Sequence, residues 1–303
     1  ADKEMSQITS LGGLLAVYTQ RFSTDDPGRR DHRLAEAEPL ALEWVERTTR
    51  RLGPRSTTTL QATTKWAEIV CGRGRYAEAA AACRTVLENG SAERLGECHS
   101  ARTGAMYTLA ECLTRMGEEQ EPADLLLRVI QCARTAYSPD NPVFLGIVSD
   151  SLRYIERGGR GAEGEALARE LSATLRRFAS SHGDMTFIPD LFVASFVSMQ
   201  GRLDEADALF RPLLAAADRQ DDIRTRARAH VMYGNHLVRL RRFEEAESEL
   251  NLAARTVPDI RQGTWDSHPD DLILAYITLY KAWNKPEELQ RYTALRAEIF
   301  NRQ

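Results

Sequence analysis

The sequence lacks the features that would place the chain in a membrane or on a nucleic acid. Its longest apolar run near the start, Leu11 to Tyr18, is too short to span a bilayer and follows acidic rather than basic residues. It also has no excess of cations, because 40 Lys and Arg face 44 Asp and Glu and the net charge is -4. Little positive charge is therefore available to neutralise a phosphate backbone. We expect neither a membrane nor a nucleic-acid partner.

Motifs for metal binding and catalysis are missing as well. The five cysteines and six histidines show no Cys-x-x-Cys pair and no four-ligand zinc spacing. The chain has no Gly-x-Ser-x-Gly nucleophile turn and no His-Arg-Asp or Asp-Phe-Gly kinase motif. The segment 159–164 has the Gly-x-Gly-x-x-Gly spacing of a dinucleotide loop, but it follows an amphipathic helical pattern rather than a strand. We predict no metal, no cofactor and no enzymatic activity.

The cysteines suggest a compartment. They are odd in number, and most of them lie inside apolar helical patterns. They are Cys71, Cys83, Cys98, Cys112 and Cys132. This usage predicts buried free thiols in a reducing, cytoplasmic environment. The chain begins with Ala1 rather than Met, so we treat a processed chain, or a region of a longer protein, as open.

A regular repeat is the main feature that is present. Hydrophobic residues make up 43% of the chain and charged residues 28%, which is enough apolar surface for a core. A short segment of the form Gly-Arg-aromatic/Leu-x-Glu-Ala recurs between amphipathic helical patterns, most clearly at Gly74–Ala79. Its copies begin at residues 32, 74, 117, 159, 201, 241 and 284, so the steps are 42, 43, 42, 42, 40 and 43 residues. Such spacing is typical of stacked helical hairpins.

The residue types of the repeat explain why a hairpin forms. A glycine at the junction readily takes the positive φ that ends a helix, and the small residue that follows lets the second helix approach the first. The first helices carry a large residue followed by a small one, eight residues before the junction. These pairs are Trp66-Ala67, Leu109-Ala110, Val193-Ala194 and Tyr233-Gly234.

The pattern predicts an all-α chain, a right-handed α-α superhelix of about seven helical hairpins that form a single domain over residues 1–303. Residues 22–32 read as a longer loop, which contains Pro27 and Gly28. The predicted helix pairs are 4–22 with 33–51, 57–73 with 75–89, 99–116 with 119–137, 142–157 with 162–180, 185–200 with 203–219, 222–240 with 243–256, and 269–283 with 286–301.

The array resembles tetratricopeptide repeats of the longer, kinesin-light-chain type, over nearly the whole chain. Leu52-Gly53-Pro54-Arg55-Ser56-Thr57-Thr58-Thr59-Leu60 is similar to that family's inter-repeat Leu-Gly-Pro-x-His-Pro-x-Thr-Leu, with Ser56 and Thr57 in place of His and Pro; residues 137–142 are a looser copy. Residues 279–287 resemble the closing segment of tetratricopeptide regions attached to bacterial serine/threonine kinases, with Asn284 in place of Gly. The resemblance implies a solenoid that binds proteins or peptides, and it transfers no activity.

In such a solenoid the first helices line the concave face. The polar positions outside the large-small stripe are therefore candidates for a peptide-binding groove, and each of them also fits a solvated helix face. We single out Glu68, Tyr107, Glu111, Arg153, Ser195, Arg228 and Asn235. The side-chain amide of Asn235 can pair with a peptide backbone, and Glu68 and Glu111 disfavour a purely acidic ligand in the first half of the chain.

We therefore expect a non-catalytic scaffold for a protein or peptide ligand, in the interaction or sensor region of a larger signalling protein. The alternatives are a regulator that changes shape when it senses a peptide or small ligand, and a helical-toroid enzyme with clustered acids. A further alternative is self-association through the C-terminal end around Tyr280, Trp283 and Ile299.

Overall fold

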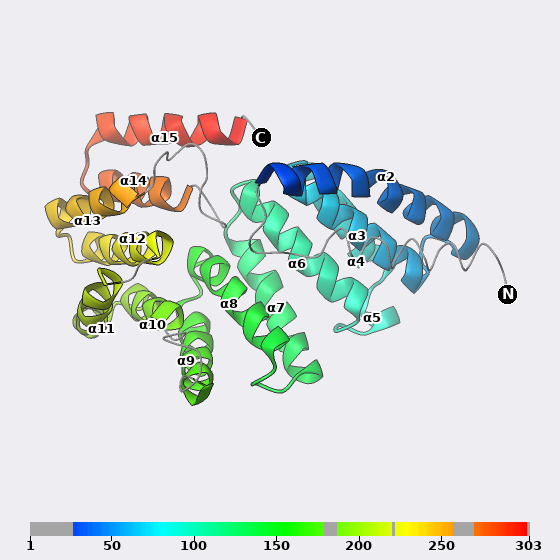
Figure 1. The fold of residues 1–303 in the computed structure, drawn as a ribbon, viewed down its shortest axis with the longest axis horizontal. Helices are drawn as coiled ribbons and strands as arrows, with labels where there is room; N and C mark the ends of the chain where they lie inside the picture. Colours follow the sequence, from blue (N-terminus) through cyan, green and yellow to red (C-terminus); the bar gives the residue numbers. More distant parts are fainter. Residues whose placement is uncertain (1–26, 179–186, 220–221, 257–269, 302–303) are drawn as a thin grey trace. The chain divides into compact units, whose positions relative to one another are not determined.

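Helices account for all the regular secondary structure that can be described. The computed structural model describes residues 27–178, 187–219, 222–256 and 270–301. Within these ranges it contains fourteen helices and no strand (Figure 1). No helix in this part of the chain is both long and apolar enough to cross a bilayer.

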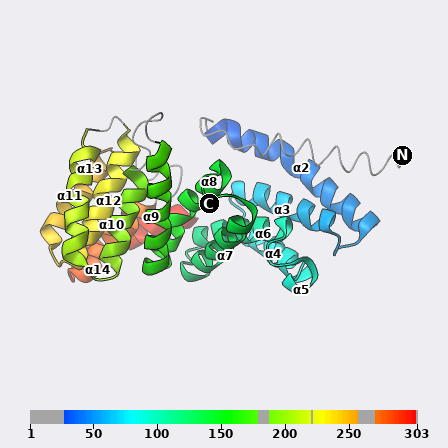
Figure 2. The same cartoon turned by 90° about the horizontal axis from the view of Figure 1, so that it is seen from below.

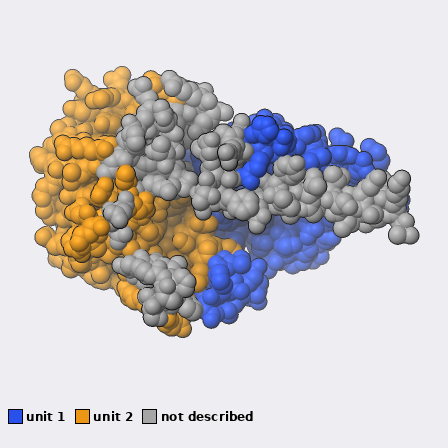
Figure 3. Space-filling model, viewed as in Figure 1, with its two compact units in different colours: residues 1–144 blue, residues 145–303 orange. Residues whose placement is uncertain are grey.

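The chain divides into two compact units, Ala1–Phe144 and Leu145–Gln303 (Figure 3). The helices of the first unit are α2 (Pro27–Leu52), α3 (Thr57–Gly72), α4 (Tyr76–Asn89), α5 (Ala92–Leu95), α6 (Ser100–Arg115) and α7 (Gln120–Ala136). Helix α8 (Pro142–Arg157) crosses the boundary, and its residues from Leu145 onward belong to the second unit. The remaining helices of that unit are α9 (Gly161–Phe178), α10 (Phe187–Met199), α11 (Leu203–Ala217), α12 (Ile223–Arg239), α13 (Phe243–Thr256), α14 (Asp270–Ala282) and α15 (Pro286–Asn301).

Within each unit, neighbouring helices pair as hairpins. Helix α3 packs on α4 and α6 on α7 in the first unit, and α10 on α11, α12 on α13 and α14 on α15 in the second. The first helices of successive hairpins also touch (Figure 2). Helix α3 contacts α6, and α12 contacts both α10 and α14. From residue 57 onward, each predicted helix has a counterpart whose ends lie within two residues of the prediction. That all hairpins form one domain stays a prediction.

The prediction for the start of the chain is wrong in one respect. Residues 27–32 were expected in a loop with a junction at His32, but α2 begins at Pro27 and His32 lies inside it. Proline is favourable at the first position of a helix, where its missing N–H costs nothing. The helix then continues because Leu34, Ala37 and Ala41 are buried in a cluster with Ile69 of α3. The predicted helix 4–22 lies outside the described residues.

The junction turns have the predicted left-handed backbone. Gly74, Gly117 and Gly201 have φ of 82°, 92° and 78°. At the first of these, the N–H of Gly74 donates to the Cys71 carbonyl at 3.0 Å and that of Arg75 to the Val70 carbonyl at 3.1 Å. These two bonds cap the last carbonyls of α3 and stop the helix. Two junctions use other residues in the same conformation, Arg241 with φ 60° and Asn284 with φ 58°.

Small residues allow the helices to approach one another, as the repeat predicts. Ala67, Ala110 and Ala194 have no exposed surface. A Cβ on Gly234 of α12 would lie 2.8 Å from the Leu250 side chain of α13. The segment 159–164 follows the same logic, because Gly159 forms the turn with φ 73° and Gly164 faces the ring of Phe196 on α10. Its glycine spacing therefore has a packing explanation.

The prediction of five free thiols is wrong for two of them. Cys98, in the linker between α5 and α6, forms a disulfide with Cys132 of α7, with Cα atoms 5.0 Å apart. Helical periodicity could not reveal this pair, because Cys98 lies in a linker whose position is set by packing. Cys71, Cys83 and Cys112 are free and buried, as predicted.

Arg241→Gly should stabilise the second unit. An L-residue in the left-handed region costs roughly 1–2 kcal/mol, which glycine avoids. We expect the free energy of unfolding, measured by urea denaturation, to rise by about 1 kcal/mol. Ser248→Gly, at an exposed position inside α13, is the matched control and should lower it by a similar amount. Equal losses in both variants would contradict the turn assignment.

Gly164→Ala should destabilise the second unit because its Cβ would lie 2.3 Å from the buried Phe196 ring. Overpacking of this kind costs roughly 1–3 kcal/mol, which outweighs the helix propensity that alanine gains. Gly146→Ala in α8 is the control, since a Cβ there meets nothing within 4 Å. We expect a lower melting temperature for Gly164→Ala and an equal or higher one for Gly146→Ala.

Candidate functional site

Four helices of the second unit share a connected set of charged and polar side chains. We call α8, α10, α12 and α14 the first-helix layer, because each ends at a left-handed junction turn, at residues 159, 201, 241 and 284. Of the predicted site residues, Arg153 lies on α8, Ser195 on α10, and Arg228 and Asn235 on α12. The layer can be followed in Figure 1 among the green to orange helices.

Glu156 links two of these helices. The buried hydroxyl of Ser195 on α10 donates a hydrogen bond to the carboxylate of Glu156 on α8. Burial raises the pKa of Glu156, while the Ser195 hydrogen bond and the charges of Arg239 and Arg228 oppose that rise. Burial therefore disfavours the charged form of this carboxylate, and the Ser195 hydroxyl and the two arginines offset part of that cost.

Arginines outnumber carboxylates among the residues of the layer that interact with one another; Asp190 of α10 instead pairs with Arg176 of α9. Arg153 lies over the Tyr154 ring, 4.6 Å from its centroid, and donates to the Tyr154 hydroxyl at 2.9 Å. Its Nε is buried without a hydrogen-bond partner. Burial lowers the pKa of Arg228, although the carboxylates of Asp271 and Glu156 favour its charged form.

Two further arginines complete the layer. Arg157 of α8 forms an ion pair with Asp271 of α14 at 3.4 Å. Arg239 of α12 is exposed, and its Nη1 donates to the Ser198 hydroxyl at 3.4 Å and to the Asn235 carbonyl at 3.5 Å. Six charged residues of the layer thus act on one another, namely Arg153, Arg157, Arg228 and Arg239 with Glu156 and Asp271.

The structure therefore joins three of the four predicted residues of this unit and adds others. Arg153, Arg228 and, through Glu156, Ser195 act on one another electrostatically. Asn235 is half-buried, one turn before Arg239. Arg157, Arg239 and Asp271 were not singled out from the sequence. The four-residue spacing from Arg153 to Arg157 and from Asn235 to Arg239 is the signal that could have found the two arginines.

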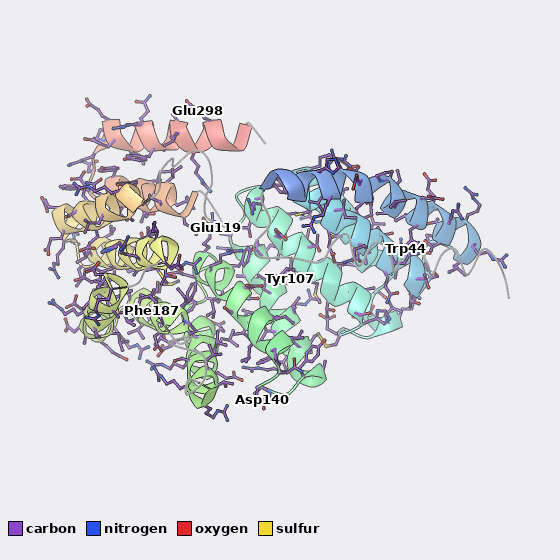
Figure 4. The ribbon with its side chains drawn as sticks, viewed as in Figure 1. Trp44, Tyr107, Glu119, Asp140, Phe187 and Glu298 are labelled. Atoms are coloured by element: carbon purple, nitrogen blue, oxygen red, sulfur yellow. A yellow bond between two sulfur atoms is a disulfide. The ribbon has the colours of Figure 1, made fainter. Side chains whose placement is uncertain are left out.

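The first unit carries the acidic candidates. Glu68 of α3 pairs with Lys65 one turn before it, and both side chains are partly exposed. Tyr107 and Glu111 lie one turn apart on α6 and are half-buried. Figure 4 labels Tyr107. Helices α3 and α6 are neighbours, so the three residues belong to one helix layer of this unit. Its character differs from that of the second unit, because its predicted site residues bring negative charge.

A buried Ser-His-Asp arrangement in the second unit looks like a hydrolase triad but is closed to substrate. The hydroxyl of Ser198 lies 2.8 Å from Nδ1 of His236, and Nε2 of His236 lies 3.8 Å from Asp207. Ser198 is 1% exposed and His236 is fully buried, in contact with the rings of Phe210 and Tyr233. A nucleophile must reach a substrate carbonyl, so this arrangement works as a packing element. Among the described residues, no group of three or more His, Cys, Asp or Glu is placed to hold a metal ion.

The inter-repeat segments that resemble known families have structural roles here. Ser56 caps α3 by accepting from the Thr59 N–H at 3.2 Å, and the Thr59 hydroxyl donates to the Gly53 carbonyl at 2.8 Å. In the closing segment, Trp283 stacks on Phe243 and Lys285 lies 3.4 Å from the centroid of the Trp283 ring. These contacts fix the turns between helices and point to no ligand.

Comparison with solved structures identifies the fold. A kinesin light chain-like protein of Podosopora anserina, described as having nearly identical TPR-like repeats, aligns with a TM-score of 0.54 and 20% identity over 71% of this chain and 98% of that one. A tetratricopeptide repeat protein from Parabacteroides merdae aligns with a TM-score of 0.56 and 12% identity over 97% of this chain and 93% of that one. No family model and no curated protein matches the sequence. The predicted class, an all-α solenoid of the tetratricopeptide type, is confirmed.

Two histidines of α12 should give the second unit opposite pH responses. A hydrogen bond with Glu249, supported by the charge of Asp218, raises the pKa of His230, whereas burial lowers that of His236. The stability that His230 contributes to the fold is thus complete below its unfolded-state pKa of about 6.5, and it is lost as the pH rises through the folded-state pKa. The stability that His236 contributes to the fold is present above its unfolded-state pKa of about 6.5, and it is lost as the pH falls through the folded-state pKa.

The measurement is the free energy of unfolding of His230→Gln and His236→Gln at about pH 5.5 and about pH 8.5. Relative to the unsubstituted chain, His230→Gln should lose more stability at the lower pH. His236→Gln should lose more at the higher pH. The same pH dependence for both variants would show that the pairing with Glu249 does not hold in solution.

Proposed function

We propose that this chain is a non-catalytic scaffold whose first-helix layers bind segments of partner proteins. The single observation that carries the proposal is the interacting set in the layer of the second unit, in which four arginines from α8 and α12 act on the carboxylates of Glu156 and Asp271. A repeat solenoid of this fold is typical of protein-protein interaction, and charged side chains gathered across successive helices suit an extended ligand.

The charge of the layer suggests the chemistry of the bound segment. Arginine pairs with carboxylates through two parallel hydrogen bonds, and Arg153 is partly exposed while Arg239 is exposed. We therefore assign to the second unit a peptide segment with acidic side chains, and to Asn235 the recognition of its backbone. Glu68 and Glu111 make the layer of the first unit unsuited to such a segment, and Tyr107 offers it an aromatic contact.

Two arms of one experiment separate charge recognition from backbone recognition. Peptides that bind the full chain are selected from a displayed random library, and the best acidic peptide is compared with its Glu→Gln, Asp→Asn counterpart by fluorescence anisotropy. Arg153→Glu should weaken the binding of the acidic peptide at least tenfold, about 1.4 kcal/mol. It should also abolish the higher affinity of the acidic peptide relative to its neutral counterpart. Asn235→Ala should weaken both peptides by the same factor.

Controls make the outcome decisive. Arg219→Glu removes an exposed arginine after α11, outside the layer, and should leave binding unchanged. Circular dichroism confirms that each variant folds. Selection of no peptide, or binding that responds to Arg219→Glu and not to Arg153→Glu, would contradict the proposal and place any interaction on another face.

The finer role as a sensor in a signalling protein is part of the same proposal. A peptide-sensing regulator would change its dimensions when the selected peptide binds, whereas a rigid scaffold would not, and small-angle scattering with and without that peptide distinguishes them. Self-association through the C-terminal end has less support, because Tyr280 is buried in a stack with Tyr276 and Tyr292.

A cytoplasmic location remains a proposal as well, and its basis has changed. It rested on free thiols, and three cysteines fit that expectation while Cys98 and Cys132 do not. Disulfides persist mainly in oxidising compartments, and those found in the cytosol are usually reversible. The properties of this bond therefore bear on where the chain works.

A further inference from the structure

The Cys98–Cys132 disulfide joins a linker to a helix within the first unit. Cys98 precedes α6 by two residues, and Cys132 lies in the last turns of α7. Cys98 is exposed, whereas Cys132 is 4% exposed. A thiol in solution can therefore reach this bond only from the Cys98 side.

The other cysteines do not compete in exchange with small-molecule thiols and their disulfides. Cys71, Cys83 and Cys112 are at most 3% exposed. A hydrogen bond with Cys112, together with burial, raises the pKa of the Cys71 thiol, and burial raises that of Cys83. Buried, protonated thiols are poor nucleophiles. Reactivity toward small thiols is thus confined to the disulfide.

Ion pairs hold the same linker in place beside the bond. The Glu97 carboxylate pairs with Arg102 of α6 at 2.8 Å and with Arg128 of α7 at 2.8 Å. Although burial opposes its ionisation, the hydrogen bonds from Arg128 and Arg102 lower the pKa of Glu97. Arg128 lies one turn before Cys132, so the ion pair and the disulfide fasten the linker to one stretch of α7.

A second contact anchors the other end of the linker. Arg94 of α5 donates to the carbonyl of Asn89 at 3.1 Å and to that of Arg55 at 2.6 Å. The ion pairs from Glu97 to α6 and α7 do not depend on the sulfur-sulfur bond, so they can hold Cys98 near Cys132 when that bond is open. Two thiols held close together re-form a disulfide readily, because closure is intramolecular.

We propose that Cys98–Cys132 is a reversible thiol-exchange site that accepts a low-molecular-mass thiol of the glutathione class at Cys98. The thiolate of the small molecule attacks the Cys98 sulfur, the bond to Cys132 breaks, and Cys132 leaves as a thiolate that takes up a proton. A second small thiol then attacks the sulfur of the bound one, which releases reduced Cys98 and the oxidised small-molecule disulfide. Oxidised small-molecule disulfide drives the two steps in reverse. Both steps are independent of any peptide bound to the scaffold.

The exchange is tested on the full chain in glutathione buffers that run from fully oxidised to fully reduced. Samples are quenched with acid and alkylated, and the site of each adduct is mapped by mass spectrometry. We expect the disulfide to open reversibly, with any glutathionyl group on Cys98. A bond that stays closed in the presence of reduced glutathione while the chain is folded, or an adduct on one of the buried cysteines, would overturn the proposal.

Matched variants keep the test independent of folding defects. Cys132→Ser leaves Cys98 without its partner, so the glutathionyl adduct on Cys98 should accumulate. Cys98→Ser leaves the buried Cys132 and should form none. Equal labelling of the two variants, with circular dichroism showing that both are folded, would contradict one-sided access.

A third variant tests the role of the ion pairs. Glu97→Gln removes the charge that holds the linker near α7, so reclosure of the reduced chain by oxidised glutathione should slow severalfold while the opening step changes little. Hydrogen exchange of residues 91–99 should rise on reduction, and more so in Glu97→Gln. Unchanged reclosure in this variant would show that the ion pairs do not preposition the thiols.

Discussion

The left-handed turn that ends each first helix is the constraint on which the rest of the structure depends. A helix stops where one residue takes positive φ and the N–H groups of that residue and the next cap the free carbonyls, as at Gly74 and Arg75. Because this turn is short, the next helix must fold back along the first. Small residues such as Ala67 and Gly164 then allow the close approach that buries the aliphatic stripes. The same turn repeated near every 42 residues places the first helices next to one another.

That adjacency creates the candidate site of the second unit. To the candidate site, each helix of the layer contributes only one to three of the named residues, so no single helix carries the site. Side chains separated by many residues, such as Glu156 and Ser195 or Arg157 and Asp271, meet because their helices are neighbours. The partial burial of these groups matters for binding, because electrostatic interactions strengthen where water is displaced. It also makes each charge costly unless it is matched, which is why carboxylates accompany the arginines.

The sequence predicted correctly the features that depend on residues close together in the chain, and missed those that depend on tertiary packing. Junctions at 74, 117, 159, 201, 241 and 284 follow from residue types within a few positions of the turn, and they are confirmed by their positive φ. The junction expected at His32 failed because burial of Leu34 and Ala37 against α3 extends the helix through it. The short helix α5 and the position of Cys98 were also missed, since no periodic pattern marks a linker.

The sequence by itself determined the class of fold, the period of the repeat and the residue types available to the first-helix layers, because helix capping and amphipathic spacing act between residues close in the chain. Only the tertiary structure decided which of those residues share an environment. It grouped Arg153 and Arg228 with Glu156 and Asp271, enclosed Ser198 and His236, and joined Cys98 to Cys132. These outcomes depend on how one hairpin packs on the next, and packing is a property of surfaces that are distant in the sequence.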